Sequence, residues 1–520
     1  KEKVMGYHTY HTIREITEHA YRQYKDCVAA RYKTGKNEVK AKTYGQLRED
    51  SDCISNALSA IGEQGKHIAL IGASSYEWLI SYFGIVNGGS VAVPLDASLP
   101  AAELCELINR ADVTALFVDA ARRDVINAVK TECPGLKYRI VMRQENETQD
   151  QAQRGQMYQG DYILLRDLLK EYQGGYPAEI TPETLCTIMF TSGTTGKSKG
   201  VMLTHRNLAE NATCLDMNIP EKSVVLSVLP IHHAYCLCMD ILKGFSLGST
   251  ICINDSLIHM AKNIKLFQPN IMLMVPLMIE SLAKKLQAAK DLPAELVKEN
   301  VFGAQFHTIF SGGAYLNPDY ITLFERFGIS ILQGYGMTEC SPVISTTMAG
   351  KQKKQSVGML MPNCEAKTVD GELYVRGSSV MQGYYKMPEE TKEALSDGWL
   401  KTGDLGYVDE EGYVYLTGRK KNLIITKNGE NVSPEEIENK LGTSPLVAEI
   451  LVREAEDVIE AEIFPDSEYA ANEKITDIKE KLQSLIDAYN VGASAYKRVY
   501  HLKVRENEFE KTASRKIKRF

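Results

Sequence analysis

Short apolar runs alternate with amphipathic stretches from about residue 66 to about residue 333. The runs have the length of β-strands, and the stretches between them repeat apolar positions at helical spacing. This alternation predicts parallel sheets covered by helices, which bind ligands at the carboxyl ends of their strands. The predicted strands are 67–71, 91–94, 114–118, 224–228, 250–253, 271–275, 308–310 and 329–332, and the predicted helices are 74–87, 101–110, 204–216, 256–267, 276–289 and 317–327.

The pattern changes after about residue 365, where short strands and turns replace the alternation. A compact α+β unit of about 100 residues follows. We therefore expect an α/β protein with a large N-terminal domain of doubly wound sheets and a β-rich subdomain (residues 1–418), and a small α+β C-terminal domain (residues 419–520). The predicted later strands are 371–375, 413–417, 422–426, 446–452, 458–464 and 499–505, and the predicted later helices are 433–441 and 474–488.

The composition is that of an ordinary globular protein, with 44% apolar and 24% charged residues. The net charge of −7 argues against a nucleic-acid partner, which favours a basic surface. No apolar run reaches about 18 residues, so no transmembrane segment is expected. The eleven cysteines form no C-x-x-C pair, which predicts reduced thiols and a cytoplasmic location. Cys236 and Cys238 could chelate a metal, but core thiols are favoured because no second ligand pair has zinc spacing.

Residues 190–201 read FTSGTTGKSKGV and follow an apolar run. Glycines let backbone N–H groups approach an anion, hydroxyls add donors, and Lys197 and Lys199 add positive charge. The P-loop pattern G-x-x-x-x-G-K-[ST] does not fit, because only two residues separate Gly193 from Gly196. The stretch therefore predicts an anion-binding loop of another kind.

Five further segments follow in order. They are SGGA (311–314), QGYGMTE (333–339), TGD (402–404), TGRKKN (417–422) and KTASRKIKR (511–519). Each alone is typical of a turn or a solvated cap. Together with the anion loop they resemble the adenylate-forming superfamily of acyl-CoA synthetases, peptide-synthetase adenylation domains and beetle luciferases, from near residue 40 to residue 520. The stretches GELYVRGSSVMQGYY (371–385) and NEFEKTASRKIKRF (507–520) most resemble bacterial fatty-acyl-CoA ligases.

The resemblance implies a two-step reaction that uses ATP, Mg²⁺ and CoA. A carboxylate attacks the α-phosphate of ATP and gives acyl-adenylate and pyrophosphate. A thiol then attacks the activated carbonyl and releases AMP. The anion loop would hold the β,γ-pyrophosphate, although the family commonly has Pro where this chain has Ser198. The implied pyrophosphate-binding residues are Thr191, Ser192, Gly193, Thr194, Thr195, Gly196, Lys197 and Lys199.

The resemblance also implies roles around the nucleotide. Glu339 would bind Mg²⁺ with Thr191 as a second contact, and Thr338 would lie beside the α-phosphate. Asp404 and Arg419 would bind the ribose, since one carboxylate can accept hydrogen bonds from both hydroxyls. The implied adenine slot consists of Gly312, Gly313, Ala314, Gly334, Tyr335 and Gly336.

The resemblance places His233, in the segment IHHAY (231–235), between the phosphates and an acyl tunnel. The alternative is a buried, hydrogen-bonded histidine without a catalytic role. A metal site formed with His232 is disfavoured, because adjacent residues on a strand or helix face apart.

Two lysines are implied to act with a mobile C-terminal lid. Lys516 matches the family's catalytic lysine, although the family often has Gly where this chain has Arg515. The alternative for this stretch is a solvated basic tail. Lys421 matches the hinge, and the loop at 429–431 would line a path for the thiol.

We therefore expect an ATP-dependent acyl-CoA synthetase that acts on a medium- or long-chain fatty acid, with aryl and bile-type acids left open. An acyl carrier protein is the alternative acceptor. A non-catalytic nucleotide- or acyl-adenylate-binding protein is an alternative of another class, and the presence of both Glu339 and Lys516 counts against it.

Overall fold

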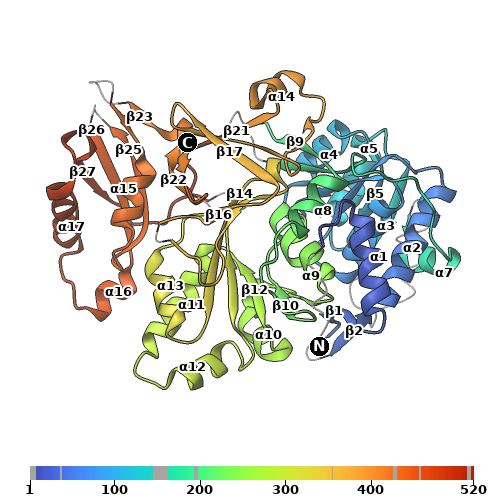
Figure 1. The fold of residues 1–520 in the computed structure, drawn as a ribbon, viewed down its shortest axis with the longest axis horizontal. Coiled ribbons are helices and arrows are strands. Elements are labelled where there is room, and N and C mark those ends of the chain that lie inside the picture. The colour runs from blue at the N-terminus through green and yellow to red at the C-terminus, as the bar shows by residue number, and fades with distance from the viewer. Residues whose placement is uncertain are drawn as a thin grey trace.

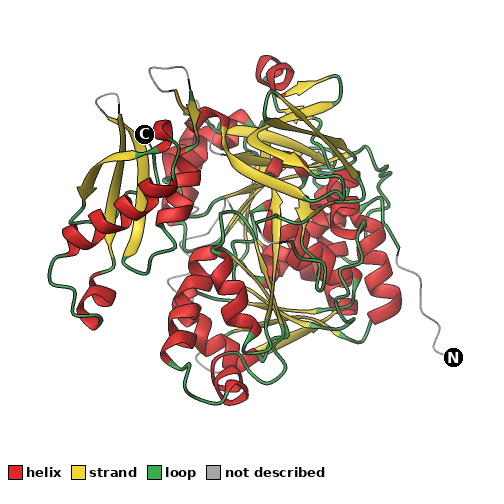
Figure 2. Ribbon diagram, turned by 60° about the vertical axis from the view of Figure 1, so that its left-hand side comes forward, coloured by secondary structure: helices red, strands yellow, loops and turns green. Residues whose placement is uncertain are grey.

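The computed structural model describes residues 8–35, 38–143, 162–191, 197–353, 355–425, 430–455, 458–511 and 517–519. Within these residues, the larger N-terminal part builds three sheets, and the smaller C-terminal part lies beside it, at the left of Figure 1. Helices flank the sheets throughout, as Figure 2 shows. The predicted α/β class with a large and a small unit is confirmed.

The first sheet has the strand order β19-β9-β8-β4-β3-β5-β6-β7 over the described residues. Helices cover both of its faces, so β3 (HIALI) alternates between two clusters of buried side chains. Its strands are β3 (His67–Ile71), β4 (Val91–Leu95), β5 (Val113–Val118), β6 (Tyr138–Val141), β7 (Ile163–Leu164), β8 (Leu185–Thr191), β9 (Lys199–Thr204) and β19 (Gly383–Tyr384). Its helices are α2 (Tyr44–Ala60), α3 (Tyr76–Asn87), α4 (Ala101–Arg110), α5 (Arg123–Glu132) and α7 (Leu165–Glu171).

The second sheet has the order β16-β15-β14-β13-β12-β10-β11-β1-β2 over the same described ranges. Its strands are β1 (Val28–Lys33), β2 (Val39–Thr43), β10 (Val224–Ser227), β11 (Thr250–Ile253), β12 (Ile271–Met274), β13 (Thr308–Ser311), β14 (Ser330–Gly336), β15 (Val343–Thr346) and β16 (Met359–Leu360). Helices α10 (Met260–Phe267), α11 (Pro276–Ala288), α12 (Ala294–Val301) and α13 (Pro318–Glu325) pack on its outer face.

The two sheets share one core. Helices between them contribute to a single cluster of buried side chains, in which the ring of Phe83 on α3 stacks on that of Phe245 with centroids 5.3 Å apart. These inner helices are α1 (Ile13–Tyr24), α8 (His205–Thr213), the π-helix η1 (Cys236–Leu242) and α9 (Lys243–Ser246). Because the sheets pack on a common core, the carboxyl ends of their parallel strands are held in a fixed relation.

The third sheet forms the predicted β-rich subdomain. Its elements are β17 (Cys364–Val369), β18 (Glu372–Gly377), α14 (Pro388–Ala394), β20 (Leu395–Ser396), β21 (Trp399–Val408) and β22 (Val414–Arg419). The strand predicted over 422–426 is wrong in part. A 3-10 turn, η4 (Lys420–Asn422), precedes a two-residue strand, β23 (Ile424–Ile425), because the chain turns here from one unit into the next.

The C-terminal part has its own cluster of buried side chains, which includes Ile437, Ile463 and Leu482. Its elements are β24 (Asn431–Val432), α15 (Pro434–Leu441), β25 (Val447–Ala455), β26 (Val458–Pro465), α16 (Ser467–Asn472), α17 (Ile478–Gly492), the 3-10 turn η5 (Ala495–Lys497) and β27 (Val499–Val504). The helix predicted over 474–488 begins later, because Asp477 caps it. An ion pair joins the two parts, with Lys284 Nζ 2.8 Å from Asp466 Oδ2.

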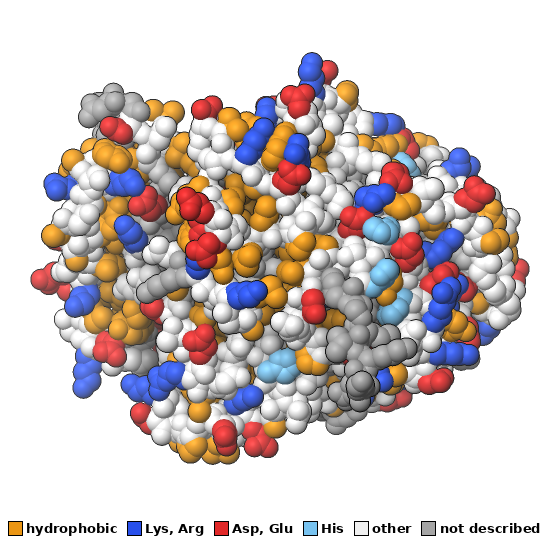
Figure 3. All heavy atoms as spheres, in the orientation of Figure 1, with side chains coloured by type: hydrophobic (Ala, Val, Ile, Leu, Met, Phe, Trp, Pro, Cys, Tyr) orange, Lys and Arg blue, Asp and Glu red, His pale blue; other side chains and the backbone are white. Residues whose placement is uncertain are grey.

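The described surface mixes both signs of charge. On the face shown in Figure 3, Lys and Arg side chains are interspersed with Asp and Glu. In the part of the chain that the structure describes, no helix combines the length and apolar character that a membrane crossing requires.

Candidate active site

The predicted phosphate loop joins β8 to β9. Thr191 ends β8 and pairs with Lys199, which begins β9, so both ends of the loop lie at one edge of the sheet. Arg110, at the end of α4, donates a hydrogen bond to the carbonyl of Ser198 over 2.6 Å. Lys197 is exposed, while Ser192, Gly193, Thr194, Thr195 and Gly196 lie outside the described residues.

The predicted adenine slot comes from two neighbouring parallel strands. Gly312, Gly313 and Ala314 follow β13, and Gly334, Tyr335 and Gly336 end β14. A Cβ at Gly312 would lie 2.8 Å from the ring of Tyr235, and one at Gly336 would lie 1.9 Å from the carbonyl oxygen of Pro342. Only glycine allows such close approach, so both positions are fixed by packing.

Tyr335 contacts the predicted ribose ligands. Its hydroxyl donates a hydrogen bond to Oδ2 of Asp404 over 2.7 Å, and Oδ1 of the same carboxylate lies 2.7 Å from Nε of Arg419. Asp404 and Arg419 are also paired across β21 and β22. Burial, and then the charge of Asp404, raise the pKa of Tyr335 far above its usual value, so its hydroxyl stays a donor. Three residues predicted from three motifs therefore form one continuous contact.

Glu339 lies in the short 3-10 helix η3 (Thr338–Cys340), next to Thr338. Its carboxylate is buried and accepts a hydrogen bond from the hydroxyl of Tyr384 over 2.9 Å. The ammonium of Lys199 lies 4.9 Å from the centroid of the Tyr384 ring. Tyr384 thus connects the base of the phosphate loop to the predicted metal ligand.

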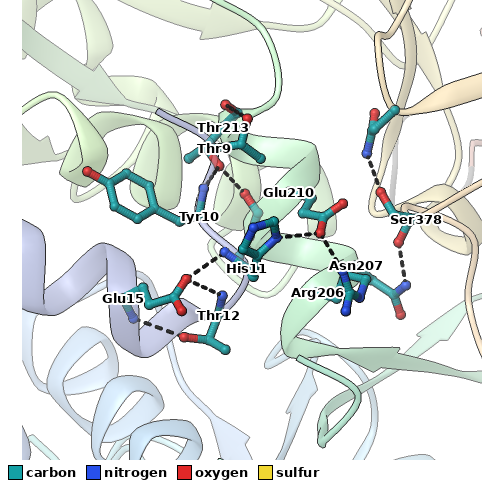
Figure 4. A network of polar contacts seen from close by, with 12 residues as sticks. Thr9, Tyr10, His11, Thr12, Glu15, Arg206, Asn207, Glu210, Thr213 and Ser378 are labelled. Atoms are coloured by element: carbon teal, nitrogen blue, oxygen red, sulfur yellow. Dashed lines mark hydrogen bonds and ion pairs between the residues drawn. The ribbon is translucent and has the colours of Figure 1, made fainter. Parts of the chain in front are cut away.

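Helix α8 holds the segments around Glu339. The amide of Asn207 donates to the carbonyls of Ser378 (2.7 Å) and Val380 (3.0 Å), and Figure 4 shows Asn207 beside Ser378. One turn later, the amide of Asn211 donates to the carbonyl of Val343 over 2.8 Å. The segments before Tyr384 and after Glu339 are therefore attached to the same helix.

The N-terminal segment braces α8 from its other side (Figure 4). Nδ1 of His11 lies 2.7 Å from Oε1 of Glu210, and Arg206 pairs with the same oxygen over 2.8 Å. Hydrogen bonds with His11, Arg206 and Ser378 lower the pKa of Glu210 against the effect of its burial. The charged Glu210 therefore anchors the N-terminal segment to the helix that supports the site.

The segment 231–235 spans the two sheets. The N–H of Ile231 donates to Ser74 Oγ after β3 over 3.2 Å, and His232 Nε2 lies 3.9 Å from Asp96 Oδ2 after β4. Burial lowers the pKa of His232 to about 3, so this ring is neutral. His233 is exposed in part, yet burial of its ring by surrounding protein lowers its pKa as well.

The prediction that His232 and His233 face apart is wrong. Their ring centroids lie 4.3 Å apart, because the segment is a turn and not a strand or helix. Among the described residues, no three His, Cys, Asp or Glu side chains are grouped to hold a metal ion. Cys236 and Cys238 are buried thiols, as predicted.

The predicted hinge and lid residues are described only in part. Lys421 lies in η4, where burial and then Arg419 lower the pKa of its ammonium. The amide of Asn422, next in the chain, donates to Glu435 Oε1 over 2.5 Å. Lys516 lies outside the described residues, as does Gly429. Lys511 pairs with Glu449 over 2.5 Å, which fixes one end of the segment that carries Lys516.

Sequence reasoning missed Tyr384 and Arg110. Tyr384 lies in the stretch GELYVRGSSVMQGYY, whose paired tyrosines were a usable signal. No sequence signal pointed to Arg110, because it contacts Ser198 across 88 positions of the chain. The individual roles of the site residues stay predictions.

Comparison with known proteins places this geometry in a family. The model of the AMP-binding enzyme family matches residues 17–385, and the model of its C-terminal domain matches residues 421–520. A crotonobetaine/carnitine–CoA ligase of Salmonella paratyphi A is 27% identical over 477 aligned positions, and the match covers 86% of this chain and 88% of that protein. A long-chain-fatty-acid–CoA ligase of Salmonella typhimurium is 28% identical over 475 aligned positions, and the match covers 83% of this chain and 80% of that protein.

Solved structures share the fold. An anthranilate CoA ligase in complex with anthranoyl-AMP superposes with a TM-score of 0.82 at 22% identity, covering 98% of this chain and 96% of that one. A fatty acyl CoA synthetase of Mycobacterium tuberculosis gives 0.70 at 21% identity with the same coverage. The chain therefore belongs to the family of AMP-binding enzymes, and the curated relatives it resembles are acid–CoA ligases.

Proposed function

We propose that this AMP-binding enzyme is an acid–CoA ligase that activates a medium- or long-chain fatty acid with ATP. The contact from Tyr335 through Asp404 to Arg419 carries the proposal. It sets an aromatic ring beside a buried carboxylate and a guanidinium, a combination that suits the base and ribose of a nucleotide. The relative named for long-chain fatty acids supports the choice of acid.

In the first step, the carboxylate of the acid attacks the α-phosphorus of ATP, and the bond to the leaving pyrophosphate breaks. Lys197 and Lys199 lie at the C-terminal end of the loop that would receive the pyrophosphate, and their charges would stabilise the leaving group. His233, whose lowered pKa favours the neutral ring, would orient the attacking carboxylate. Lys516 would stabilise the negative charge that develops between carboxylate and phosphate.

The residues present fit a magnesium ion. Mg²⁺ prefers hard oxygen ligands and keeps several waters, so one carboxylate with phosphates is enough. Glu339 gives one oxygen to Tyr384 and has a second to offer, and Thr191 supplies a hydroxyl at the mouth of the phosphate loop. A bound ion would screen the charge of the phosphates, while Tyr384 keeps the Glu339 carboxylate oriented.

In the second step, the thiol of CoA attacks the acyl-adenylate carbonyl, and AMP leaves. Residues 419–520 would turn as a lid about Lys421, which lies in the short turn between the units. Glu430 and Asn431, the described part of the predicted thiol path, are exposed at the start of β24.

Exchange of radioactive pyrophosphate into ATP, dependent on an added acid, tests the adenylation step. We expect exchange with fatty acids and thioester formation with CoA. Thioester formation with an acyl carrier protein and not with CoA would identify the carrier protein as the acceptor of the acyl group. Nucleotide binding without exchange for any acid would favour the non-catalytic alternative and overturn the proposal.

A further inference from the structure

A cavity opens beside the predicted adenine slot. Its lining includes Tyr235, Phe310 and Gly334, which lie in or beside the predicted motifs, together with Met217, Leu247 and Ser249. The space open to the centres of water molecules is about 30 Å³. If the proposed function holds, this cavity receives the acyl part of the substrate, because it starts where the activated carboxyl would lie.

The lining is mostly apolar, but it includes two buried charged residues, Asp240 and Lys243, and Nζ of Lys243 donates a hydrogen bond to the carbonyl of Leu215 over 2.7 Å. Asp240, on the π-helix η1, lines the cavity and is only 3% exposed. Two side chains already hydrogen-bond it, namely the Cys236 thiol, 3.7 Å from Oδ2, and the hydroxyl of Ser227. Burial raises the pKa of Asp240 to about 7, so near neutral pH the carboxyl is present both as acid and as carboxylate.

Ser249 is a further polar residue of the lining. The hydroxyl of Ser249 is buried and has no hydrogen-bond partner among the described residues. A buried polar group without a partner costs free energy, so such a group in a cavity wall indicates a ligand that pairs with it. A plain alkyl chain would leave Ser249 without a partner and Asp240 with only the Cys236 thiol and the Ser227 hydroxyl.

We propose that the acid activated by this protein carries a hydrogen-bond donor, a hydroxyl or an amino group, within its acyl part, and that Asp240 selects for that group. This inference rests on the proposed function and narrows its fatty acid to a substituted one. Asp240 would accept the donor's hydrogen, and the Ser249 hydroxyl would complete the site.

The test measures acid-dependent pyrophosphate exchange over matched acids: alkanoates, their hydroxy and amino counterparts with the group at successive carbons, and trimethylammonium analogues. We expect kcat/KM for the best hydroxy or amino acid to exceed that of the alkanoate of equal length by roughly 10- to 100-fold, the effect of one added hydrogen bond to a charged group. Comparison of the hydroxy acids with the amino acids distinguishes a neutral hydrogen-bond donor from a cationic one.

Three variants locate the selection. Asp240→Leu should abolish or reverse the preference, and Asp240→Asn should keep a preference for hydroxy acids, because an amide still accepts hydrogen bonds. Met239→Leu changes another cavity residue without changing polarity, so it should leave the preference intact. The readout is a ratio between substrates of one folded enzyme, which a general loss of stability does not move.

Equal activity on alkanoates and substituted acids, or a preference only for trimethylammonium acids, would overturn this inference and leave the proposed ligase activity standing. A preference unchanged in Asp240→Leu would remove Asp240 as its source. If none of the acids supported pyrophosphate exchange, both proposals would be overturned together.

Discussion

The hydroxyl of Tyr384 donates a hydrogen bond to the carboxylate of Glu339 over 2.9 Å, and the ring of the same tyrosine lies under the ammonium of Lys199. One side chain therefore contacts both the base of the predicted phosphate loop and the predicted metal ligand. Strand β19 holds it there by pairing Tyr384 with Val201 on β9. This relationship makes Glu339 and Tyr384 a pair whose separate roles can be measured.

Glu339→Gln keeps the size of the side chain but removes its charge, so we expect pyrophosphate exchange to fall by at least about 10²-fold at fixed magnesium. Tyr384→Phe keeps the ring under Lys199 and removes only the hydroxyl, so a loss of about 10-fold is expected. Exchange rates over a magnesium titration check both. Unchanged activity and magnesium dependence in Glu339→Gln would assign this carboxylate a purely structural role.

Asp404→Asn should raise KM for ATP by roughly 10- to 100-fold, because a carboxylate that accepts two ribose hydrogen bonds becomes a weaker acceptor. The variant should also discriminate less between ATP and 2′-deoxy-ATP. Asp409→Asn, in the turn of the same β21–β22 hairpin, is the matched control and should leave both values unchanged. Normal discrimination in Asp404→Asn would place the ribose elsewhere.

Lys516→Ala and Lys421→Pro should separate the two half-reactions. Loss of the Lys516 ammonium removes a preorganised charge, so adenylation should fall by roughly 10²–10³-fold while supplied acyl-adenylate still reaches CoA. Proline at Lys421 fixes φ near −65°. The enzyme should therefore still make acyl-adenylate, but its lid should fail to turn. Acyl-adenylate and thioester are measured for both variants. Equal loss of both steps in each would indicate a static site.

Activity should rise with the length of the acyl chain and then stop sharply. Each methylene that the cavity buries contributes about 0.8 kcal/mol, or roughly fourfold in affinity. Values of kcat/KM for a homologous series of acids, unsubstituted and substituted, check the trend. A flat response from acetate to palmitate, or a preference for benzoates, would contradict a medium- or long-chain substrate.

The buried carboxyl of Asp240 should make stability depend on pH. Its pKa is about 7 in the folded protein against an ordinary value of 3.8, so between these values the folded state keeps a proton that the unfolded chain has lost. Stability contributed by this group is therefore full below about pH 4 and falls as pH rises to about 7, by up to about 1.4 kcal/mol per pH unit. Asp240→Asn does not titrate there, so its unfolding free energy relative to the original protein should grow over this window. If the difference in unfolding free energy between the variant and the original protein stayed constant from about pH 4.5 to pH 7, it would contradict the raised pKa of Asp240.

The sequence was most informative where one pattern dominated. The apolar runs 67–71 and 250–253 form strands with those bounds, because both are buried in parallel sheets. Strand β1 was missed, since only half of it faces the core and its sequence VAARYK lacks a continuous apolar run. Helix α16 was missed because six residues carry too little periodicity.

The candidate site was predictable as a set of motifs, but its contacts were not. The segments that hold Asp404 and Arg419 were identified by their resemblance to a family, and the structure pairs them. The hydrogen bond from Tyr384 to Glu339 depends on β19 joining a sheet whose other strands end at or before Thr204, far earlier in the chain, and no local pattern encodes that return. The same holds for Asp240, whose place in a cavity wall depends on the packing of η1.

The pairing of β1 with β11 has a consequence for synthesis of the chain. Ala30 is paired with Ile251, so β1 must wait for about 220 residues to be translated before its parallel partner exists. At about 5–20 residues per second, that interval is roughly 10 to 45 s. During this time β1 can pair only with β2, and the edge of the hairpin that β11 later covers stays open. This N-terminal hairpin is therefore where we expect a ribosome-bound chain to need most protection from incorrect association.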